Sequence, residues 1–498
     1  MSKTASTLSH ESEGAVINLD SALARHPKSR PIIVDFDGTI LLRNSTEAYL
    51  DAAWPRQVAA LLLAFLDLIK PWRLFPGGDR SWIYSDWTRV MALTVLLPWS
   101  LPLWQFRAPS VARRYVNTSL LKRLAPWPAG SVSVATFGFR LVVAPLLRTI
   151  SPDMHLAVAG SFLSGFRLRR LGKAQALQRA IGADALSASL VITDSNDDAD
   201  LVPVTAELVM IDCPPEAHRR ALQDCYVPFQ YMNSAKRPGE NHFFRQILYR
   251  DLLILSISYA LHSTYPLLVC IGLLLLQLSY WIIYEIGYWE NDCIGSLYED
   301  KPVIRAGFAK FKDRFNPAWA WGLALLIGLA GAVPLELAAA THIAHEGLPS
   351  LFSLLIIWSI WILYLCGVRL IFYVYNRIDV VTRVFLYPAL QITKHFGFVV
   401  LLPISFIGAA LCTTQVLVRW IPYIVYRYGG TRWMMPQALV NLTIFNLLIT
   451  MLSLAIARMT VFHQPEIWFI EIWFLVHARK QIMALVHDFV WLPRRHSD

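Results

Sequence analysis

Hydrophobic positions divide the chain into two halves with different spacing. Up to about residue 250, short apolar runs alternate with charged stretches, whereas residues 250–490 consist mostly of long apolar runs. Short apolar runs bounded by turn residues indicate the strands and helices of a packed domain, and runs near about 20 residues are long enough to cross a bilayer. The pattern therefore predicts a globular part followed by a membrane part.

In the globular half, runs that are typical of strands alternate with runs that are typical of helices, which indicates a doubly wound α/β sheet. The expected strands are 31–34, 131–135, 155–159, 189–193 and 207–211, and the expected helices are 137–150 and 172–181. Residues 45–130 are expected to form a helical insertion. Its apolar stretches, 58–69 and 90–103, are too short or too proline-broken to span, so they lie on the bilayer surface or form the core of a cap.

The membrane half contains enough apolar sequence for about seven to nine helices at about 20 residues each. The first run is long enough for two spans with a turn near 262–266. Polar residues concentrate in two expected connecting segments, 285–315 and 375–395. The apolar runs are 251–288, 316–342, 350–375, 384–412, 415–427, 435–458 and 465–490.

Composition supports the same division. Hydrophobic residues make up 55% and charged residues 16%, whereas a soluble protein carries roughly 25% charge. The net charge of +10 fits cytoplasmic loops and anionic headgroups, and because no basic stripe is interleaved with aromatic residues, no nucleic-acid partner is expected. The six cysteines have no CxxC spacing, which argues against a disulfide framework or a zinc site.

The N-terminal residues 1–30 are polar, are expected to be disordered and lack the apolar core of a signal peptide. The globular half is therefore expected in the cytoplasm, in a multi-pass protein of a bacterial inner membrane.

Polar side chains follow the expected strands at four places. The carboxyl ends of parallel strands converge on one crevice. There a carboxylate can accept a phosphoryl group, a second can protonate the leaving oxygen, and Mg²⁺ held by carboxylates can neutralise phosphate charge. The four places are Asp35-Phe-Asp37-Gly-Thr, Thr136, Lys173 at a helix start, and Asp194-Ser-Asn-Asp-Asp198.

These motifs, in this order, resemble those of the haloacid dehalogenase (HAD) phosphatase superfamily, over about residues 31–212 of an expected domain 31–215. Thr193 departs from the family pattern, which has Gly there, and the stretch 155–173 is compact. The carboxylates alternatively serve only as loop caps, or the domain is inactive. The resemblance implies Asp35 as nucleophile, Asp37 as acid/base, Thr136 and Lys173 as phosphate holders, and Asp35, Asp37, Asp194 and Asp198 as magnesium ligands.

A second group of polar residues interrupts the apolar half. Acidic residues at the mouth of a helix bundle are costly unless they are paired or bind a metal, so they are functional candidates. The carboxylates and amide of 290–300 suit Mg²⁺ on a phosphate or diphosphate, and nearby basic residues suit its oxygens. The residues are Glu290, Asn291, Asp292, Glu299, Asp300, Lys301 and Arg305.

The segment 375–394 supplies a further polar cluster. If it is helical, Asp379 and Arg383 share one face, and Tyr387, Gln391 and Lys394 share another. A cavity lined in this way suits an anionic head group with an apolar tail. The cluster comprises Tyr375, Asn376, Arg377, Asp379, Arg383, Tyr387, Gln391 and Lys394.

This arrangement resembles the UbiA superfamily of intramembrane prenyltransferases, over an expected domain 248–492 that follows a linker, 216–247. Asn291-Asp292, Glu299 and Lys301-Pro302 are similar to that family's first aspartate-rich motif, although Gly295 takes an acidic position, Glu299 replaces an Asp, and Asp379 is left from the second aspartate pair. A single-metal or more cationic site fits better than an all-Asp, two-metal site.

The resemblance implies three kinds of site residue, against the alternative that these are ordinary loops whose basic residues set topology. Metal ligands are Asn291, Asp292, Glu299 and Asp379; phosphate contacts are Lys301, Arg305, Arg377, Arg383 and Lys394; and substrate contacts are Tyr288, Glu290, Asp300, Tyr375, Asn376, Tyr387 and Gln391.

The two resemblances together predict a bifunctional Mg²⁺-dependent enzyme. Its membrane part transfers a phosphoribosyl-type group from a diphosphate donor to polyprenyl phosphate, and its HAD part removes a phosphate from the product. The alternatives are a prenyltransferase with another acceptor and an accessory HAD domain, a membrane-anchored phosphatase, and a transporter or scaffold without catalysis. The oligomeric state is left open.

Overall fold

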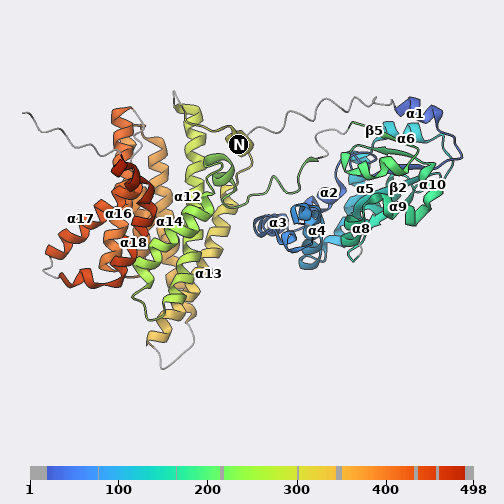
Figure 1. Ribbon diagram of the computed structural model, residues 1–498. Helices are drawn as coiled ribbons and strands as arrows, with labels where there is room; N and C mark the ends of the chain where they lie inside the picture. The colour runs from blue at the N-terminus through green and yellow to red at the C-terminus, as the bar shows by residue number, and fades with distance from the viewer. Residues whose placement is uncertain are drawn as a thin grey trace, which may run out of the picture. The chain divides into compact units, whose positions relative to one another are not determined.

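The computed structural model describes residues 19–76, 78–163, 165–212, 218–299, 302–343, 350–430, 436–455 and 459–487 (Figure 1). The chain divides into two compact units, Met1–Val227 and Pro228–Asp498. Helix α1 (Leu19–Arg25) lies in the segment expected to be disordered, and its Leu19 and Leu23 are buried.

A five-stranded parallel sheet forms the centre of the first unit, in the order β3-β2-β1-β4-β5. The predicted strands are all confirmed, with ends shifted by one or a few residues. The strands are β1 (Ile32–Asp35), β2 (Val132–Phe139), β3 (His155–Gly160), β4 (Leu190–Thr193) and β5 (Glu207–Met210). The direction in which successive strands are added to the sheet reverses between β1 and β4. In open α/β sheets, ligands bind at the carboxyl ends of the strands next to such a switch point.

Strand β2 is longer than expected. It continues through Phe137 to Phe139, so helix α7 (Arg140–Ile150) begins three residues later than predicted. The pairing of β2 with β3 shifts register between Ala135 and Phe139, and such irregularities re-aim side chains at the edge of a site. Thr136 therefore lies inside the strand rather than after it.

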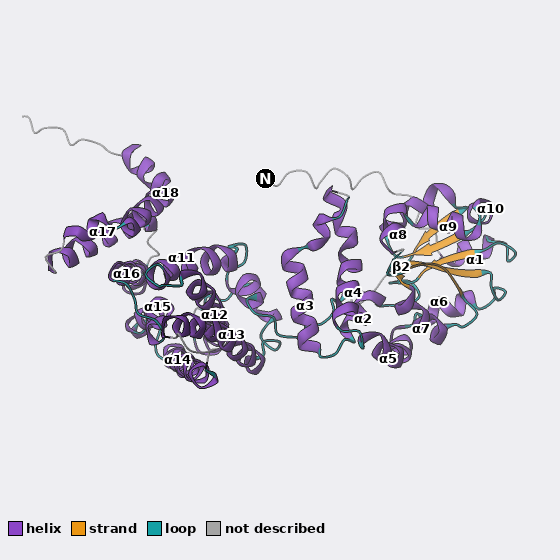
Figure 2. Cartoon of the chain, turned by 90° about the horizontal axis from the view of Figure 1, so that it is seen from below, coloured by secondary structure: helices purple, strands orange, loops and turns teal. Residues whose placement is uncertain are grey.

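Helices cover both faces of the sheet, which confirms the doubly wound class. Ile32 and Val34 of β1 pack into one core and Ile33, between them, into the other. Figure 2 shows α8, α9 and α10 on one face and α5, α6 and α7 on the other. The bounds are α5 (Ser100–Tyr115), α6 (Thr118–Leu124), α8 (Gly165–Leu171), α9 (Lys173–Ile181) and α10 (Ala183–Ser187), with the 3-10 helix η3 (Asn196–Val204) after β4.

The predicted helical insertion is present between β1 and β2. Helices α3 and α4 lie side by side and extend away from the sheet (Figure 2). Besides α5 and α6, the insertion contains α2 (Ser45–Asp51), α3 (Arg56–Ile69), α4 (Ser85–Leu96) and the 3-10 helices η1 (Pro71–Leu74) and η2 (Gly78–Tyr84).

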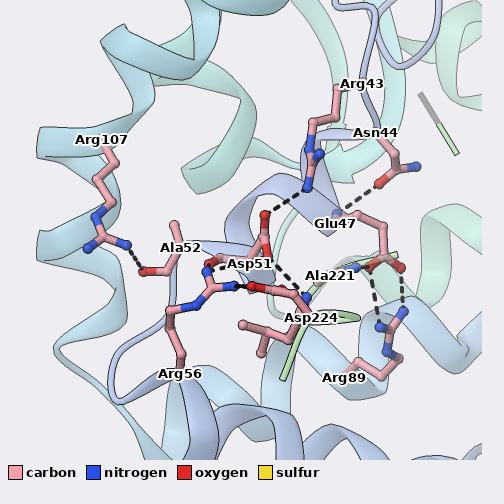
Figure 3. A network of polar contacts seen from close by, with 11 residues as sticks. Arg43, Asn44, Glu47, Asp51, Ala52, Arg56, Arg89, Arg107, Ala221 and Asp224 are labelled. Carbon is pink, nitrogen blue, oxygen red and sulfur yellow. Dashed lines mark hydrogen bonds and ion pairs between the residues drawn. The ribbon is translucent and has the colours of Figure 1, made fainter. Parts of the chain in front are cut away.

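The last residues of the first unit are tied to this insertion by a polar network (Figure 3). Glu47 of α2 accepts the backbone N–H of Ala221 at 2.7 Å and pairs with Arg89 of α4 at 2.6 Å. Arg56, the first residue of α3, pairs with Asp224 at 2.8 Å. The chain therefore leaves the first unit along α2, α3 and α4.

The second unit is helical. Helix α12 packs against α13 and α14, and α16 packs against α15 and α17. The α-helices are α11 (Leu252–Leu255), α12 (Pro266–Tyr298), α13 (Pro317–Ile343), α14 (Leu351–Arg377), α15 (Tyr387–Phe396), α16 (Phe406–Gly429), α17 (Gln437–Ala455) and α18 (Pro465–His487). Shorter elements are the π-helices η5 (Met232–Lys236), η6 (Phe243–Asp251) and η7 (Ser256–Ala260), and the 3-10 helices η8 (Ala306–Lys310), η9 (Thr382–Phe385), η10 (Gly397–Val400) and η11 (Met459–His463).

Within the described residues, five helices are long and apolar enough to cross a membrane: α12, α13, α14, α16 and α17. By composition the chain is a multi-pass membrane protein. The predicted break near 262–266 is confirmed, because a turn separates η7 from α12.

Two expected connections have a different structure. The first half of 285–315 is helical, because α12 continues to Tyr298 and ends shortly before Pro302, a residue that disfavours helix just before it. Residues 228–247 of the expected linker belong to the second unit and contain η5 and the start of η6.

Candidate functional site

The end of β1 carries a buried cluster of charges. Asp35 is the last residue of the strand, and its Oδ1 lies 2.6 Å from Lys173 Nζ. The same ammonium lies 2.7 Å from Asp198 Oδ1. Lys173 is the first residue of α9 and follows Gly172, whose φ of +87° favours glycine. Because all three side chains are buried, the lysine fixes the carboxylates from β1 and η3 next to each other.

Asp37 is held two residues further on by different donors. Its Oδ1 accepts the backbone N–H of Ser45, at the start of α2, at 2.5 Å, and its Oδ2 accepts Thr136 Oγ1 at 3.0 Å. The Thr136 hydroxyl in turn accepts the backbone N–H of Gly138 at 2.8 Å. Thr136 thus orients Asp37, in addition to any contact it makes with phosphate.

The loop after β4 brings Asp194 against the first loop. Its Oδ1 accepts Thr39 Oγ1 at 3.0 Å. A Cβ atom at Gly38 would lie 2.0 Å from Asp194 Oδ2, and Gly38 has a φ of +83°. Only glycine fits at this position of the Asp-Phe-Asp-Gly-Thr motif, because any side chain would collide with Asp194.

Thr193 has a clear role at the position where the HAD pattern has Gly. Its Oγ1 donates to Asp198 Oδ2 at 2.7 Å and accepts the backbone N–H of Ser195 at 3.2 Å. The departure from the family pattern adds a hydrogen bond that holds Asp198.

Burial determines the protonation of these groups. It raises the pKa of Asp35 to about 7, although Lys173 opposes the shift. Burial also raises the pKa of Asp37, against the hydrogen bonds from Ser45 and Thr136. For Lys173 burial favours the neutral amine, but the carboxylates of Asp35 and Asp198 outweigh it and raise its pKa. A raised pKa lets Asp37 carry a proton for transfer.

The carboxylates suit Mg²⁺ in chemical type, because hard oxygen donors are its preferred ligands. Among the residues that the structure describes, no group of three or more His, Cys, Asp or Glu is placed to hold a metal ion. Asp198, one of the four expected ligands, is engaged by Lys173 and Thr193. The described structure therefore does not bring the four predicted ligands, Asp35, Asp37, Asp194 and Asp198, together as a metal site, and Asp198 acts as a positioning residue.

Arg169 of α8 is a residue that the sequence reasoning missed. Its guanidinium carbon lies 5.7 Å from the centre of the Phe139 ring, and its Nη1 is buried without a hydrogen-bond partner in the described part of the chain. Burial lowers its pKa, against the carboxylates of Asp86 and Asp37. A cation that interacts with Asp37 is suited to an anionic substrate. In the sequence it is one of several arginines on a short helix, which look like surface charge.

The second unit contains a cavity of about 1540 Å³ that most of the expected membrane-site residues line. Among the described residues, seven basic and three acidic side chains line it, so this lining favours anions. Expected residues in its lining are Asn291, Asp292, Glu299, Arg305, Asn376, Arg377, Asp379, Arg383 and Tyr387.

Two of the three acidic lining residues, Asp292 and Glu299, are paired with cations. Asp292 lies 2.6 Å from Lys236 Nζ and accepts the Tyr231 hydroxyl. Glu299 pairs with Arg383 at 2.8 Å. This pairing leaves an excess of basic side chains in the described lining.

Several expected residues have other partners. The side chains of Asp379 and Arg383 have different partners: Asp379 Oδ2 accepts the backbone N–H of Val381 at 2.8 Å, and Arg383 pairs with Glu299. Lys394 lies outside the cavity lining and is buried against Asp251 at 2.9 Å.

The remaining expected residues lie around or beyond the cavity. Glu290 is 2.9 Å from both Arg369 and Arg377. Tyr375 shares a hydrogen bond of 2.9 Å with Tyr423 of the lining. Tyr288 lies beneath the ammonium of Lys236, Gln391 is buried on α15, and Asp300 and Lys301 lie outside the described residues.

The lining also contains four basic residues and a tyrosine, Tyr423, that the sequence pattern did not predict as site residues. Lys236 and Arg237 lie in the expected linker, and Arg419, Tyr423 and Arg427 lie on α16 inside an apolar run. Arg419, Tyr423 and Arg427 are four residues apart and share a helical face. Charged residues at that spacing in an apolar run are the signal that identifies them.

No protein-family model, curated protein or solved structure matches this chain. The functional argument therefore depends on the geometry of the two units and on the motifs themselves.

Proposed function

We propose that this chain is a Mg²⁺-dependent enzyme of polyprenyl-phosphate metabolism in a bacterial inner membrane. The first unit, on the cytoplasmic side, is a HAD-type phosphatase, and the second is a UbiA-like transferase that acts on a polyprenyl phosphate. The observation that carries the proposal is the buried Asp35–Lys173–Asp198 cluster beside Asp37 at the switch point of the sheet.

In the phosphatase reaction a carboxylate oxygen of Asp35 attacks phosphorus, and the bond from phosphorus to the ester oxygen breaks. Asp37, whose pKa is raised by burial, gives its proton to the leaving oxygen. The resulting aspartyl phosphate is hydrolysed when Asp37 takes a proton from an attacking water. Inorganic phosphate leaves and the Asp35 carboxylate is restored.

The other residues of the site hold charge in place. Lys173 keeps Asp35 oriented and provides a positive charge for phosphate oxygens, and Thr136 keeps Asp37 in its rotamer. Asp35, Asp37 and Asp194 would be the side chains available to hold Mg²⁺, which would supply positive charge against the phosphate oxygens. The buried cation of Arg169 offers a further contact for an anionic substrate.

In the second unit the cation-rich cavity binds the two phosphorylated substrates. A phosphate oxygen of the polyprenyl phosphate attacks the anomeric carbon of a phosphoribosyl diphosphate donor, and diphosphate leaves with the electrons of the broken C–O bond. The product keeps the phosphate on its sugar, which the first unit then removes. We propose that the helical run Phe243–Ala260 and α18 complete, with the five spans, a bundle of seven helices, the lower end of the expected seven to nine.

The purified full-length protein tests this proposal. Given polyprenyl phosphate, phosphoribosyl diphosphate and Mg²⁺, it should form lipid-linked ribose and release diphosphate and inorganic phosphate. Absence of any lipid-linked sugar from folded protein would overturn the transferase part, and phosphatase activity on a sugar phosphate would then still be measurable separately.

One observation favours a second candidate, a phosphatase that the membrane unit only anchors. Asp292 and Glu299 are paired with Lys236 and Arg383 instead of facing a common metal position. Under that alternative, replacing Asp292 and Asp379 by Ala leaves every activity of the protein unchanged. Under the bifunctional proposal, the same replacements abolish sugar transfer and leave phosphatase activity intact.

A further inference from the structure

The helical insertion of the first unit exposes a group of large apolar side chains, which we call the α3–η2 tip: Phe65, Leu68, Ile69, Leu74 and Trp82. Leu74 is 89% exposed, Trp82 is 59% exposed and Phe65 is 55% exposed. Phe65, Leu68 and Ile69 are spaced at i, i+3 and i+4, so they share one face of α3. Phe65, Leu68 and Ile69 therefore form one exposed apolar face, and Leu74 and Trp82 lie in the two short helices that follow α3.

Helix α3 is apolar on two sides. Ala59, Leu63 and Leu66 are buried in the core of the unit, while the tip residues face outward. A helix that is apolar all round is normally buried in protein or in a membrane. The outer apolar face of α3 is thus not covered by other apolar side chains in the described part of the unit.

Basic side chains adjoin the tip. A cavity of about 960 Å³ is lined by Trp82 of the tip together with Lys70, Arg73, Arg89 and Arg220. Lys70 and Arg73 are exposed and lie in sequence between Ile69 and Leu74. A patch of apolar and Trp side chains with adjacent exposed Lys and Arg is suited to an anionic lipid surface.

The acidic residues of this cavity do not cancel that charge. Asp67 lies 3.7 Å from Arg220, and Asp86 lies 3.5 Å from Arg89. Glu47 is also paired with Arg89 (Figure 3). Since the carboxylates are engaged, the charges of Lys70 and Arg73 are left to attract anions.

The connection to the second unit indicates which partner the tip can reach. Its five candidate spans tether the first unit to a membrane. The tether leaves along the same helices, because Arg220 lies beside Asp67 of α3, and Asp224 pairs with Arg56 (Figure 3). A bilayer is thus the apolar and anionic partner to which the chain itself tethers the first unit.

We propose that the α3–η2 tip docks on the interface of an anionic bilayer, with its apolar side chains among the acyl chains and Lys70 and Arg73 at the lipid phosphates. This docking does not depend on the proposed catalysis. It restricts the rotation of the first unit on its tether and holds the insertion at the membrane surface.

Spin labels on the full-length protein in lipid nanodiscs test the docking. A nitroxide is attached at Leu74→Cys or, as control, at Leu163→Cys, in a background with the six native cysteines replaced by Ser. The two positions are 89% and 93% exposed in the same unit. In phosphatidylglycerol-containing discs the label at 74 should favour dissolved oxygen over a water-soluble nickel chelate, and the label at 163 should show the opposite preference.

Replacing both Lys70 and Arg73 by Glu should raise the accessibility of the label at 74 to the nickel chelate. The difference between this variant and the parent protein should depend on the salt concentration, because salt screens surface charges. Equal nickel accessibility at 74 and 163 in anionic discs would overturn the proposal. Spin–spin broadening at 74 that disappears on dilution with unlabelled protein would also overturn it, because the tip would then cover a second copy of the chain.

Discussion

Three buried charged groups near the end of β1 make the stability and the proposed activity of the first unit sensitive to single substitutions. Lys173 sits between Asp35 and Asp198, and each ion would be costly to bury alone. The motif Asp-Phe-Asp-Gly-Thr made Asp35 and Asp37 visible in the sequence, because the strand before it is a clear apolar run. Lys173 was recognisable only through a family pattern, since its helix has no other mark of a site.

Replacing Asp35 by Asn should lower phosphatase activity toward a small sugar phosphate by at least about 10³-fold, because the amide cannot form the aspartyl phosphate. Asp197→Asn is the matched control, since this side chain is exposed in η3 near the same loop. Released inorganic phosphate is the measurement. Comparable activity of the two variants would argue against Asp35 as nucleophile.

Lys173→Met should destabilise the protein by about 3–5 kcal/mol, because two buried carboxylates lose their cation. The loss should be smaller when Asp198→Asn accompanies it, since one negative charge is then removed. Thermal unfolding of the purified protein compares the variants. If the double variant were less stable than Lys173→Met, the bridging role of the lysine would be wrong.

For the helices and strands, the local hydrophobic pattern predicted which elements are present better than it predicted where they begin and end. The five strands and the helical insertion follow from short apolar runs and turns. Strand β2 runs past its expected end because its Thr-Phe-Gly-Phe stretch pairs with β3 through a shifted register. Helix α12 runs past its expected end because its acidic residues are paired and therefore do not stop the helix. Asp292 pairs with Lys236 and Glu290 pairs with Arg369. Both partners are distant in sequence, so the apolar pattern could not reveal these contacts.

The cavity of the second unit gives a prediction for α16. Arg427 lines the cavity and its Nε is buried without a hydrogen-bond partner in the described residues. Arg427→Ala should weaken binding of inorganic diphosphate by about tenfold, as loss of a charged hydrogen bond does. Lys480→Ala, an exposed change on α18, should leave the binding unchanged. Calorimetric titration of the purified protein distinguishes these outcomes.

The α3–η2 tip makes a prediction that joins docking to the proposed activity. Leu74→Glu should slow removal of phosphate from a lipid substrate in bilayers about tenfold, because an interfacial contact is lost. Activity toward a small soluble sugar phosphate should not change. Val202→Glu, at a position 57% exposed in η3, is the control. An equal loss on both substrates would point to a damaged phosphatase site instead.

At the level of the whole molecule, each unit contains a candidate site, and the two sites lie in different structural settings. One lies at the carboxyl edge of a parallel sheet, and the other is a cation-rich cavity among long apolar helices. Hydrophobic spacing predicted this division. It did not reveal Lys236, Arg237, Arg419 or Arg427, because a linker-like segment and an apolar helix acquire polar roles only through packing. Under the proposed function, the two sites act consecutively on one lipid.

The measurement that tests this account most directly is mass spectrometry of the lipid products formed from polyprenyl phosphate, phosphoribosyl diphosphate and Mg²⁺. Wild-type protein should yield lipid-linked ribose, and the Asp35→Asn variant should accumulate the same lipid with one additional phosphate on its sugar. If both proteins gave the identical product, or neither gave a lipid-linked sugar, the consecutive action of the two sites would be contradicted.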